Sequence, residues 1–255
     1  MSEHVAMGVI GAVAVSTLLW GYPEEPSARG PILLDAGARR ALRLSSSEAR
    51  RNAAQLSDVA FDLMVAYPIA VDAGGVAWVH DGNDDVATQM LLIDAEAFAI
   101  SGTINQVVKH FVARARPYTD TACTKHVPET AADADADYPR CAPDERYRSF
   151  VAGHTVVTFT SAALICAHHL HLPLYGGAAD SIACAVGLGT ATLTGLLRIA
   201  SDNHYLSDVV AGAMVGLFAG YVVPSALHYG FALRKSESGT RSSSAPLVVG
   251  FGMPF

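Results

Sequence analysis

Charge is scarce in this chain of 255 residues: Asp, Glu, Lys and Arg make up 16% of it, against 51% hydrophobic residues. Such a composition excludes an intrinsically disordered protein, which is rich in charge and poor in apolar side chains. Positive charge is scarcer still, with 17 Lys and Arg against 24 Asp and Glu. A nucleic-acid binder needs cations to meet the phosphate backbone, so we expect no nucleic-acid partner. The length is ample for a sizeable core.

Metal-binding patterns are missing too. The four cysteines form no CxxC pair and show no Cys/His spacing typical of zinc. Cys166 and Cys184 lie in apolar runs, where we expect small buried hydrophobic residues. Cys123 and Cys141 flank the acidic part of a long polar loop, residues 118–148. A cysteine pair that closes such a loop predicts a disulfide, and hence an oxidising compartment on that side of the membrane.

What the chain does have is four long runs without Asp, Glu, Lys or Arg. They cover residues 5–23, 155–179, 181–197 and 209–233. Each run approaches the roughly 20 residues that a helix needs to cross a bilayer. The first is not typical of a signal peptide, because no basic segment precedes it and no Ala-x-Ala-like site follows it. We therefore expect an uncleaved anchor or a first membrane span there.

Two further apolar segments, residues 59–80 and 88–108, each contain two carboxylates. Charges inside a spanning helix are costly unless they face the interior of a bundle or water. The sequence thus predicts an all-α bundle of six membrane-associated helices, four of them convincing as membrane spans and two doubtful. A soluble bundle whose central helices are apolar is the alternative.

The rest of the chain is more polar. Residues 24–51 hold six arginines with leucines among them, a pattern that fits either an amphipathic helix at the membrane interface or a solvated surface helix. We expect three parts: an anchor or span with this polar segment over residues 1–57, a core over 58–233, and a tail over 234–255.

Two cations stand near the end of the third apolar segment. Lys109 and Arg116 are seven residues apart, so on one helix they would project from the same face, about 10 Å apart. Pro117 then discourages further helix. Such a pair grips an anion from two directions, or else consists of interfacial cations that reach for water.

Histidines and a third cation stand at other segment ends. Gly153 and His154 open the fourth segment, where the free N–H groups of a helix start form an anion site. Arg198 ends the fifth segment. His204 and Asp208 are four residues apart, which on a helix lets the carboxylate hold a ring nitrogen of the histidine.

In an antiparallel bundle these segment ends lie on one side. We therefore expect seven residues to converge there: Lys109, Arg116, Gly153, His154, Arg198, His204 and Asp208. Three cations beside two histidines and an aspartate suit phosphate chemistry. One histidine can attack phosphorus, the other can protonate the leaving oxygen, and the cations neutralise the transition state.

These residues resemble the motifs of the type 2 phosphatidic acid phosphatase (PAP2)/vanadium haloperoxidase superfamily, which are Lys-x6-Arg-Pro, Pro-Ser-Gly-His and Ser-Arg-x5-His-x3-Asp. The first motif is complete here. The second keeps its Gly and His but has Ala152 in place of serine, and the third lacks only its serine, where Leu197 stands. The resemblance covers roughly residues 58–233.

The resemblance implies a helical bundle with its active site at one membrane face, and a lipid phosphate as substrate. It implies His204 as a nucleophile that forms a phosphohistidine, Asp208 as its orienting partner and His154 as the general acid. Phosphate would be bound by Lys109, Arg116, Arg198 and the Gly153 backbone N–H. It implies neither a metal nor a cofactor.

The departures leave other functions open. Ala152 and Leu197 each remove a hydroxyl, and a hydrogen bond to a charged group is worth about 1.5–3 kcal/mol. We expect an active enzyme, with three alternatives: a soluble or anchored periplasmic acid phosphatase, a weakened lipid-phosphate binder, or a vanadium haloperoxidase. We expect an inner-membrane, multi-pass protein whose site faces the periplasm or the outside. Loop charges do not decide this orientation, which rests on the Cys123/Cys141 pair and the family pattern.

Overall fold

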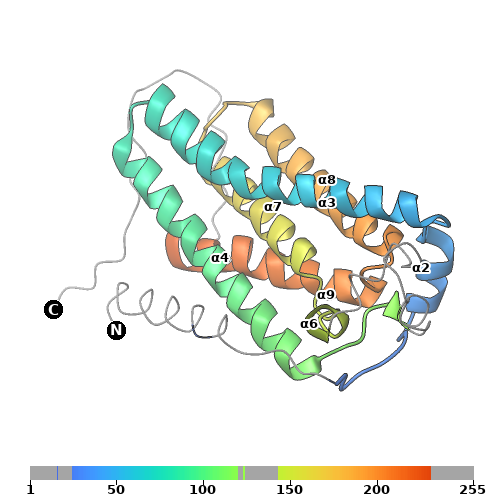
Figure 1. Cartoon of the computed structure of the whole chain (residues 1–255). Coiled ribbons are helices and arrows are strands. Elements are labelled where there is room, and N and C mark those ends of the chain that lie inside the picture. Colours follow the sequence, from blue (N-terminus) through green and yellow to red (C-terminus); the bar gives the residue numbers. More distant parts are fainter. Residues whose placement is uncertain (1–15, 17–24, 120–122, 124–142, 231–255) are drawn as a thin grey trace.

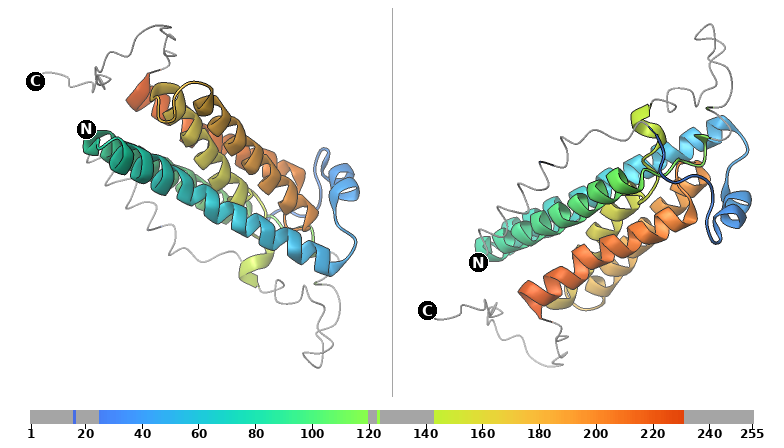
Figure 2. Two further views of the ribbon diagram at one scale, coloured as in Figure 1. Left: turned by 90° about the horizontal axis from the view of Figure 1, so that it is seen from above. Right: turned by 90° about the horizontal axis from the view of Figure 1, so that it is seen from below.

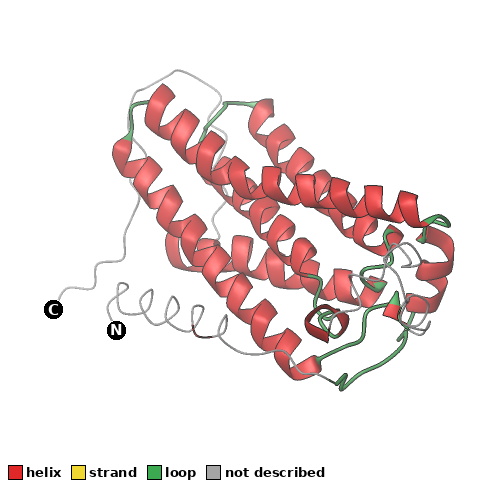
Figure 3. Ribbon diagram, in the orientation of Figure 1, coloured by secondary structure: helices red, strands yellow, loops and turns green. Residues whose placement is uncertain are grey.

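The computed structural model describes residues 16, 25–119, 123 and 143–230. Within these residues the regular secondary structure is helical (Figure 3), apart from one isolated bridge between Ala28 and Arg114. The predicted all-α fold is confirmed. The predicted first span, residues 5–23, lies outside the described residues except for Ser16.

The longest continuous helix among the described residues consists of α3 (Ser47–Ala66) and the π-helical segment η1 (Tyr67–His80), which follows it without a break. The Ser46 hydroxyl caps α3 by accepting a hydrogen bond from the Ala49 N–H. The other elements are α2 (Asp35–Leu42), α4 (Asp84–Val112), α6 (Pro143–Arg146), α7 (Gly153–His171), α8 (Ala178–Ala200), α9 (Leu206–Leu217), η3 (Phe218–Val222) and η4 (Ser225–Tyr229).

Helix α7 is the centre of the bundle. It lies among α3, α4, α8 and α9 and contacts all four (Figure 2). Most of its side chains between Thr155 and His169 are buried. Small residues allow this close packing: a Cβ added at Gly216 of α9 would lie 2.5 Å from the Val156 carbonyl oxygen. Small residues at helix contacts are the usual means by which membrane helices approach one another.

Four helical stretches of the described residues are long and apolar enough to cross a membrane. They are Ser47–His80, Asp84–Val112, Ala178–Ala200 and Leu206–Tyr229. The two segments that were doubtful in the sequence are therefore among the four. The run over residues 155–179 is not among these four. Its helix, α7, ends at His171 with three histidines in the last turn, and the neighbouring helices cover it.

Three of the four carboxylates in the doubtful segments are enclosed in the bundle, which removes the objection to them; the fourth, Asp62, is exposed. Asp72, Asp94 and Glu96 are buried. Asp94 accepts a hydrogen bond from His168, and Glu96 accepts one from His228. A buried charge is tolerated when it is paired in this way.

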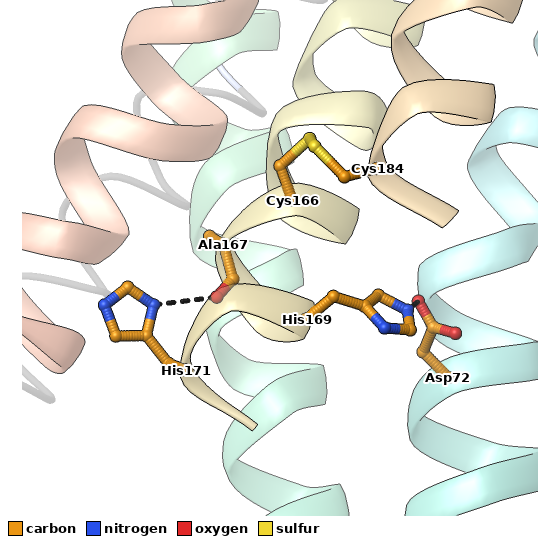
Figure 4. The surroundings of a disulfide bond; sticks show 6 residues. All are labelled: Asp72, Cys166, Ala167, His169, His171 and Cys184. Carbon is orange, nitrogen blue, oxygen red and sulfur yellow. Dashed lines mark hydrogen bonds and ion pairs between the residues drawn. A yellow bond between two sulfur atoms is a disulfide. The ribbon is translucent and has the colours of Figure 1, made fainter. Parts of the chain in front are cut away.

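The expectation for Cys166 and Cys184 was wrong, because they form a disulfide between α7 and α8 (Figure 4). The two helices approach closely where Gly187 packs on Ala162, and the cysteine Cα atoms are 4.5 Å apart. Cys123 is also disulfide-bonded. Its predicted partner, Cys141, lies outside the described residues, so that pairing stays a prediction.

Candidate active site

The ends of α4 and α8 and the starts of α7 and α9 meet at one end of the bundle, beside α2 and α6 (Figure 1). All seven predicted site residues belong to these ends or to the short segments between them. The structure therefore brings the seven residues to one end of the bundle, as expected for antiparallel helices.

Lys109 and Arg116 do not share a helix face, contrary to the prediction. Helix α4 ends at Val112, and Ala113 takes a left-handed conformation with φ 39°. The chain beyond it is extended, and the Arg116 N–H donates to the Arg146 carbonyl. The helix stops well before Pro117, so the proline does not decide where it ends.

Glycine at position 153 makes room for Lys109. A Cβ added at Gly153 would lie 2.8 Å from the Lys109 Nζ and 3.3 Å from the Asn105 Nδ2. The ammonium group therefore lies directly at the start of α7. A helix start with free N–H groups and a lysine against it is a strong site for an anion.

The nucleophile candidate, His204, lies two residues before α9 rather than on it. Its Nδ1 donates to the Ser149 carbonyl at 2.8 Å, while the Asp208 Oδ2 is 3.8 Å away. Since a carbonyl can only accept, Nδ1 carries the proton and Nε2 keeps its lone pair. The Ser149 carbonyl is therefore the hydrogen-bond partner of Nδ1, and Asp208 lies beside the ring as its nearest carboxylate charge rather than as a direct hydrogen-bond acceptor.

The environment keeps the His204 ring neutral. Burial lowers the pKa of His204 to about 3; Asp208 opposes this shift, and the positive charges of Arg116 and Arg198 add to it. A neutral imidazole with a free Nε2 is the form that can attack phosphorus.

Asp208 is held by three donors. Its carboxylate accepts hydrogen bonds from the Ser149 hydroxyl at 2.5 Å, from Arg114 at 2.6 Å and from the Tyr205 N–H at 2.8 Å. Arg114 is itself buried, ion-pairs with Asp35 at 2.7 Å and stacks on the Tyr205 ring. Sequence reasoning missed Arg114, Asp35 and Ser149, because nothing in their spacing distinguishes them from other polar residues.

Helix α2 braces the loop that carries His204. Asp202, with φ 62°, accepts two hydrogen bonds from Arg39 and one from Arg43. Asp35 accepts from both the N–H and the hydroxyl of Ser207 on the other side of the loop. The polar N-terminal segment thus forms the short helix that was expected, and two of its arginines, Arg39 and Arg43, reach the loop that carries His204.

Two half-exposed carboxylates lie against cations that the sequence predicts to bind phosphate. The Asp58 Oδ1 is 3.1 Å from Arg198 and 2.9 Å from the His154 Nε2, and Glu145 is 3.1 Å from Arg116. Both lie outside the predicted set. Because their side chains are 56% and 42% exposed, an entering anion can displace them.

A hydroxyl also stands beside Arg198, although Leu197 replaces the serine of the third motif. It belongs to Ser57 of α3, which accepts a hydrogen bond from Arg198 at 3.0 Å. The sequence spacing gave no sign of this, because Ser57 is 141 residues away.

The chain is similar to known proteins in sequence and in fold. The sequence model of the PAP2 superfamily matches residues 91–231. A lipid A 1-phosphatase of Porphyromonas gingivalis is 29% identical over 172 residues, which is 64% of this chain and 32% of that protein. The match therefore spans about a third of the relative.

A solved structure supports the fold. The crystal structure of a transmembrane PAP2-type phosphatidylglycerolphosphate phosphatase from Bacillus subtilis superposes with a TM-score of 0.52. It is 17% identical and covers 88% of this chain and 96% of its own. Together with the four apolar helices, this likeness describes a multi-pass membrane protein.

Proposed function

The chain belongs to the PAP2 superfamily, and on that premise we propose that it is a membrane phosphatase that hydrolyses a lipid phosphate through a phosphohistidine, without a metal. One observation carries this proposal. Burial holds the pKa of His204 far below its usual value, its Nδ1 proton is bound by the Ser149 carbonyl, and no described residue hydrogen-bonds its Nε2.

The reaction takes two steps. Burial and the charge of Arg198 lower the pKa of His154 to about 2, so His154 must take up a second proton as the phosphate anion binds. The Nε2 of His204 then attacks phosphorus, the bond from phosphorus to the lipid oxygen breaks, and protonated His154 gives that oxygen a proton. His154 then takes a proton from water, which attacks the phosphohistidine and breaks its P–N bond. Inorganic phosphate leaves, and both histidines return to their starting forms.

The other site residues stabilise charge and geometry. Lys109, Arg116, Arg198 and the Gly153 N–H would neutralise the equatorial phosphate oxygens. Asp208 would act through Ser149: it accepts the Ser149 hydroxyl proton, while the carbonyl of the same residue accepts Nδ1–H of His204. A carboxylate that fixes the partner of the nucleophile keeps its tautomer constant.

An apolar cavity favours a lipid over a soluble ester. It has a volume of about 410 Å³, lies between α3 and α8, and is lined by residues such as Leu63, Met64 and Val186. Leu63 follows Asp58 by five residues of α3, so the cavity begins only about 8 Å along the helix from the site. This position suits an acyl chain attached to the bound phosphate.

The cellular placement is part of the same proposal. We place the protein in the inner membrane with its site facing the periplasm or the outside, because a disulfide at Cys123 lies in the loop on the site's side. Modification of single engineered cysteines by an impermeant thiol reagent, on intact cells, tests this orientation.

Phosphate release tests the activity. The full-length protein in detergent micelles would be given phosphatidate, diacylglycerol diphosphate, undecaprenyl diphosphate and a soluble aryl phosphate, with and without a metal chelator. We expect release from at least one lipid, at a higher kcat/KM than from the aryl phosphate and unchanged by the chelator. Absence of release from all three lipids by folded protein would refute the proposal, and loss with the chelator would refute metal independence.

A further inference from the structure

Asp58 occupies a position that the reaction needs. Its Oδ1 lies 2.9 Å from the His154 Nε2, the atom that must hand a proton to the leaving oxygen. The same oxygen lies 3.1 Å from the Arg198 Nη1. The carboxylate therefore lies where the oxygen between phosphate and lipid would have to bind.

Displacement leaves Asp58 nearby. The residue is fixed to α3, the helix that also lines the apolar cavity, so a carboxylate that swings off His154 still borders the leaving group. Its side chain is 56% exposed, which gives it room to swing. The leaving group therefore departs past a negative charge.

We propose that Asp58 is the specificity-determining residue of this site, and that it selects lipid phosphate monoesters over lipid diphosphates. The inference rests on the proposed phosphatase function. With a monoester, the leaving group becomes a neutral alcohol once His154 protonates it, and any neighbouring hydroxyl can donate to Asp58. With a diphosphate, attack on the terminal phosphorus expels a lipid phosphate, which is itself an anion beside the carboxylate.

Glu145 strengthens the selection. It pairs with Arg116 at 3.1 Å and with Arg148 at 3.4 Å, so a second carboxylate already neutralises part of the cationic end of the site. Additional negative charge on a substrate thus meets cations that are already partnered. Because Asp58 is more than half exposed, solvent screens the repulsion, and we expect a selectivity of about five- to tenfold from Asp58.

The test compares two lipids that differ only in the second phosphate. Initial rates with phosphatidate and with diacylglycerol diphosphate would be measured in detergent micelles for the wild type and Asp58→Asn. The matched control is Asp62→Asn, because Asp62 is an exposed carboxylate one turn further along α3. We expect Asp58→Asn to shift the kcat/KM ratio about five- to tenfold toward the diphosphate, and Asp62→Asn to leave it unchanged.

Other ratios would overturn the inference. If Asp58→Asn lowers both rates equally, Asp58 only positions His154 and Arg198. If the ratio shifts toward the monoester, the carboxylate assists the diphosphate reaction instead. An equal shift in Asp62→Asn would assign the effect to the general charge of α3.

A binding measurement separates this inference from the proposed function. Calorimetric affinities for orthophosphate and inorganic pyrophosphate need no turnover. We expect Asp58→Asn to gain several times more affinity for pyrophosphate than for orthophosphate. If no variant releases phosphate from either lipid but this difference appears, the proposed function fails and the role of Asp58 stands; equal gains for both anions would refute that role.

Discussion

The two ends of α7 use the same residue types for different purposes. At the far end, His168, His169 and His228 each contact a carboxylate of a neighbouring helix, at 2.7 to 2.9 Å. Figure 4 shows His169 pointing from α7 toward Asp72, close to the disulfide. At the site end, His154 and His204 lie among arginines, and the nearest carboxylates are either half-exposed or already held by other donors.

The difference shows what makes a cluster of titratable residues a site. At the far end, each histidine is paired with a carboxylate, and these buried pairs join α7 to its neighbours. At the site end, positive charge exceeds negative charge, and Asp58 and Glu145 can give way to an anion. Buried histidines alone therefore do not indicate catalysis.

The largest effect is expected from loss of the nucleophile. His204→Ala should lower kcat by about 10⁴-fold or more, because no second residue replaces an attacking Nε2. Its melting temperature in micelles should stay close to that of the wild type, apart from the small cost of a lost side chain. Phosphate release assays would measure the loss, and activity within tenfold of the wild type would contradict the assigned role.

At the opposite end, His168→Ala should cost stability instead. His168 and Asp94 are both buried, and removal of one partner leaves an uncompensated polar group, which costs about 3–5 kcal/mol. We expect a clear fall in the melting temperature with kcat of the folded fraction unchanged. The double variant His168→Ala/Asp94→Leu should recover part of the lost stability. A fall in the kcat of His168→Ala at unchanged stability would contradict a purely structural role for the far end.

Low pH should destabilise the folded protein through His204 at the site end. The pKa of His204 is about 3 in the folded protein, against about 6.5 when unfolded, so below pH 6.5 the unfolded chain binds the proton first. Stability is therefore lost as the pH falls from 6.5 toward 3, by about 2–3 kcal/mol at pH 4.5 from this residue alone. Melting curves of His204→Gln should depend less on pH over this range, and identical pH profiles would show that His204 is not buried in its neutral form.

Loss of the contacts between α2 and the loop before His204 should lower activity by a smaller factor. Arg39→Gln removes two hydrogen bonds to Asp202 and loosens the loop before His204, so kcat should fall about tenfold with little change in KM. Arg40→Gln is the matched control, because Arg40 is exposed and bonds only within α2 among the contacts described. Equal kinetics of the two variants would show that the loop holds its shape without α2.

The sequence predicted the site end better than the far end. Motif residues such as His204 and Arg198 occur at fixed spacings near helix ends, and the antiparallel arrangement brings these ends together. The far-end pair His168–Asp94 joins residues 74 positions apart, and no periodicity encodes such a pair. The Arg114–Asp35 pair at the site end, whose residues are 79 positions apart, was missed for the same reason. The same holds for the Cys166–Cys184 disulfide, which depends on how closely two helices pack. Where α4 ends was also misjudged, because Ala113 gives no local signal for a left-handed turn.

The smallest effect is expected from Ala152→Ser, which restores a family hydroxyl at the start of α7. From the sequence, this hydroxyl should reach the phosphate, but Ala152 is fully buried and packs against Ile199 and Val209. Its own N–H donates to the Asp208 carbonyl, which fixes the backbone there. A serine would therefore point its hydroxyl into an apolar cluster or cap α7, where a cap is worth about 0.5–2 kcal/mol and offsets the cost of burial. We expect kcat/KM and vanadate inhibition to stay within about threefold of the wild type. A gain of tenfold or more in both kcat/KM and vanadate affinity would show that this side chain faces the anion. It would also show that an additional hydrogen-bond donor strengthens phosphate binding at the site end.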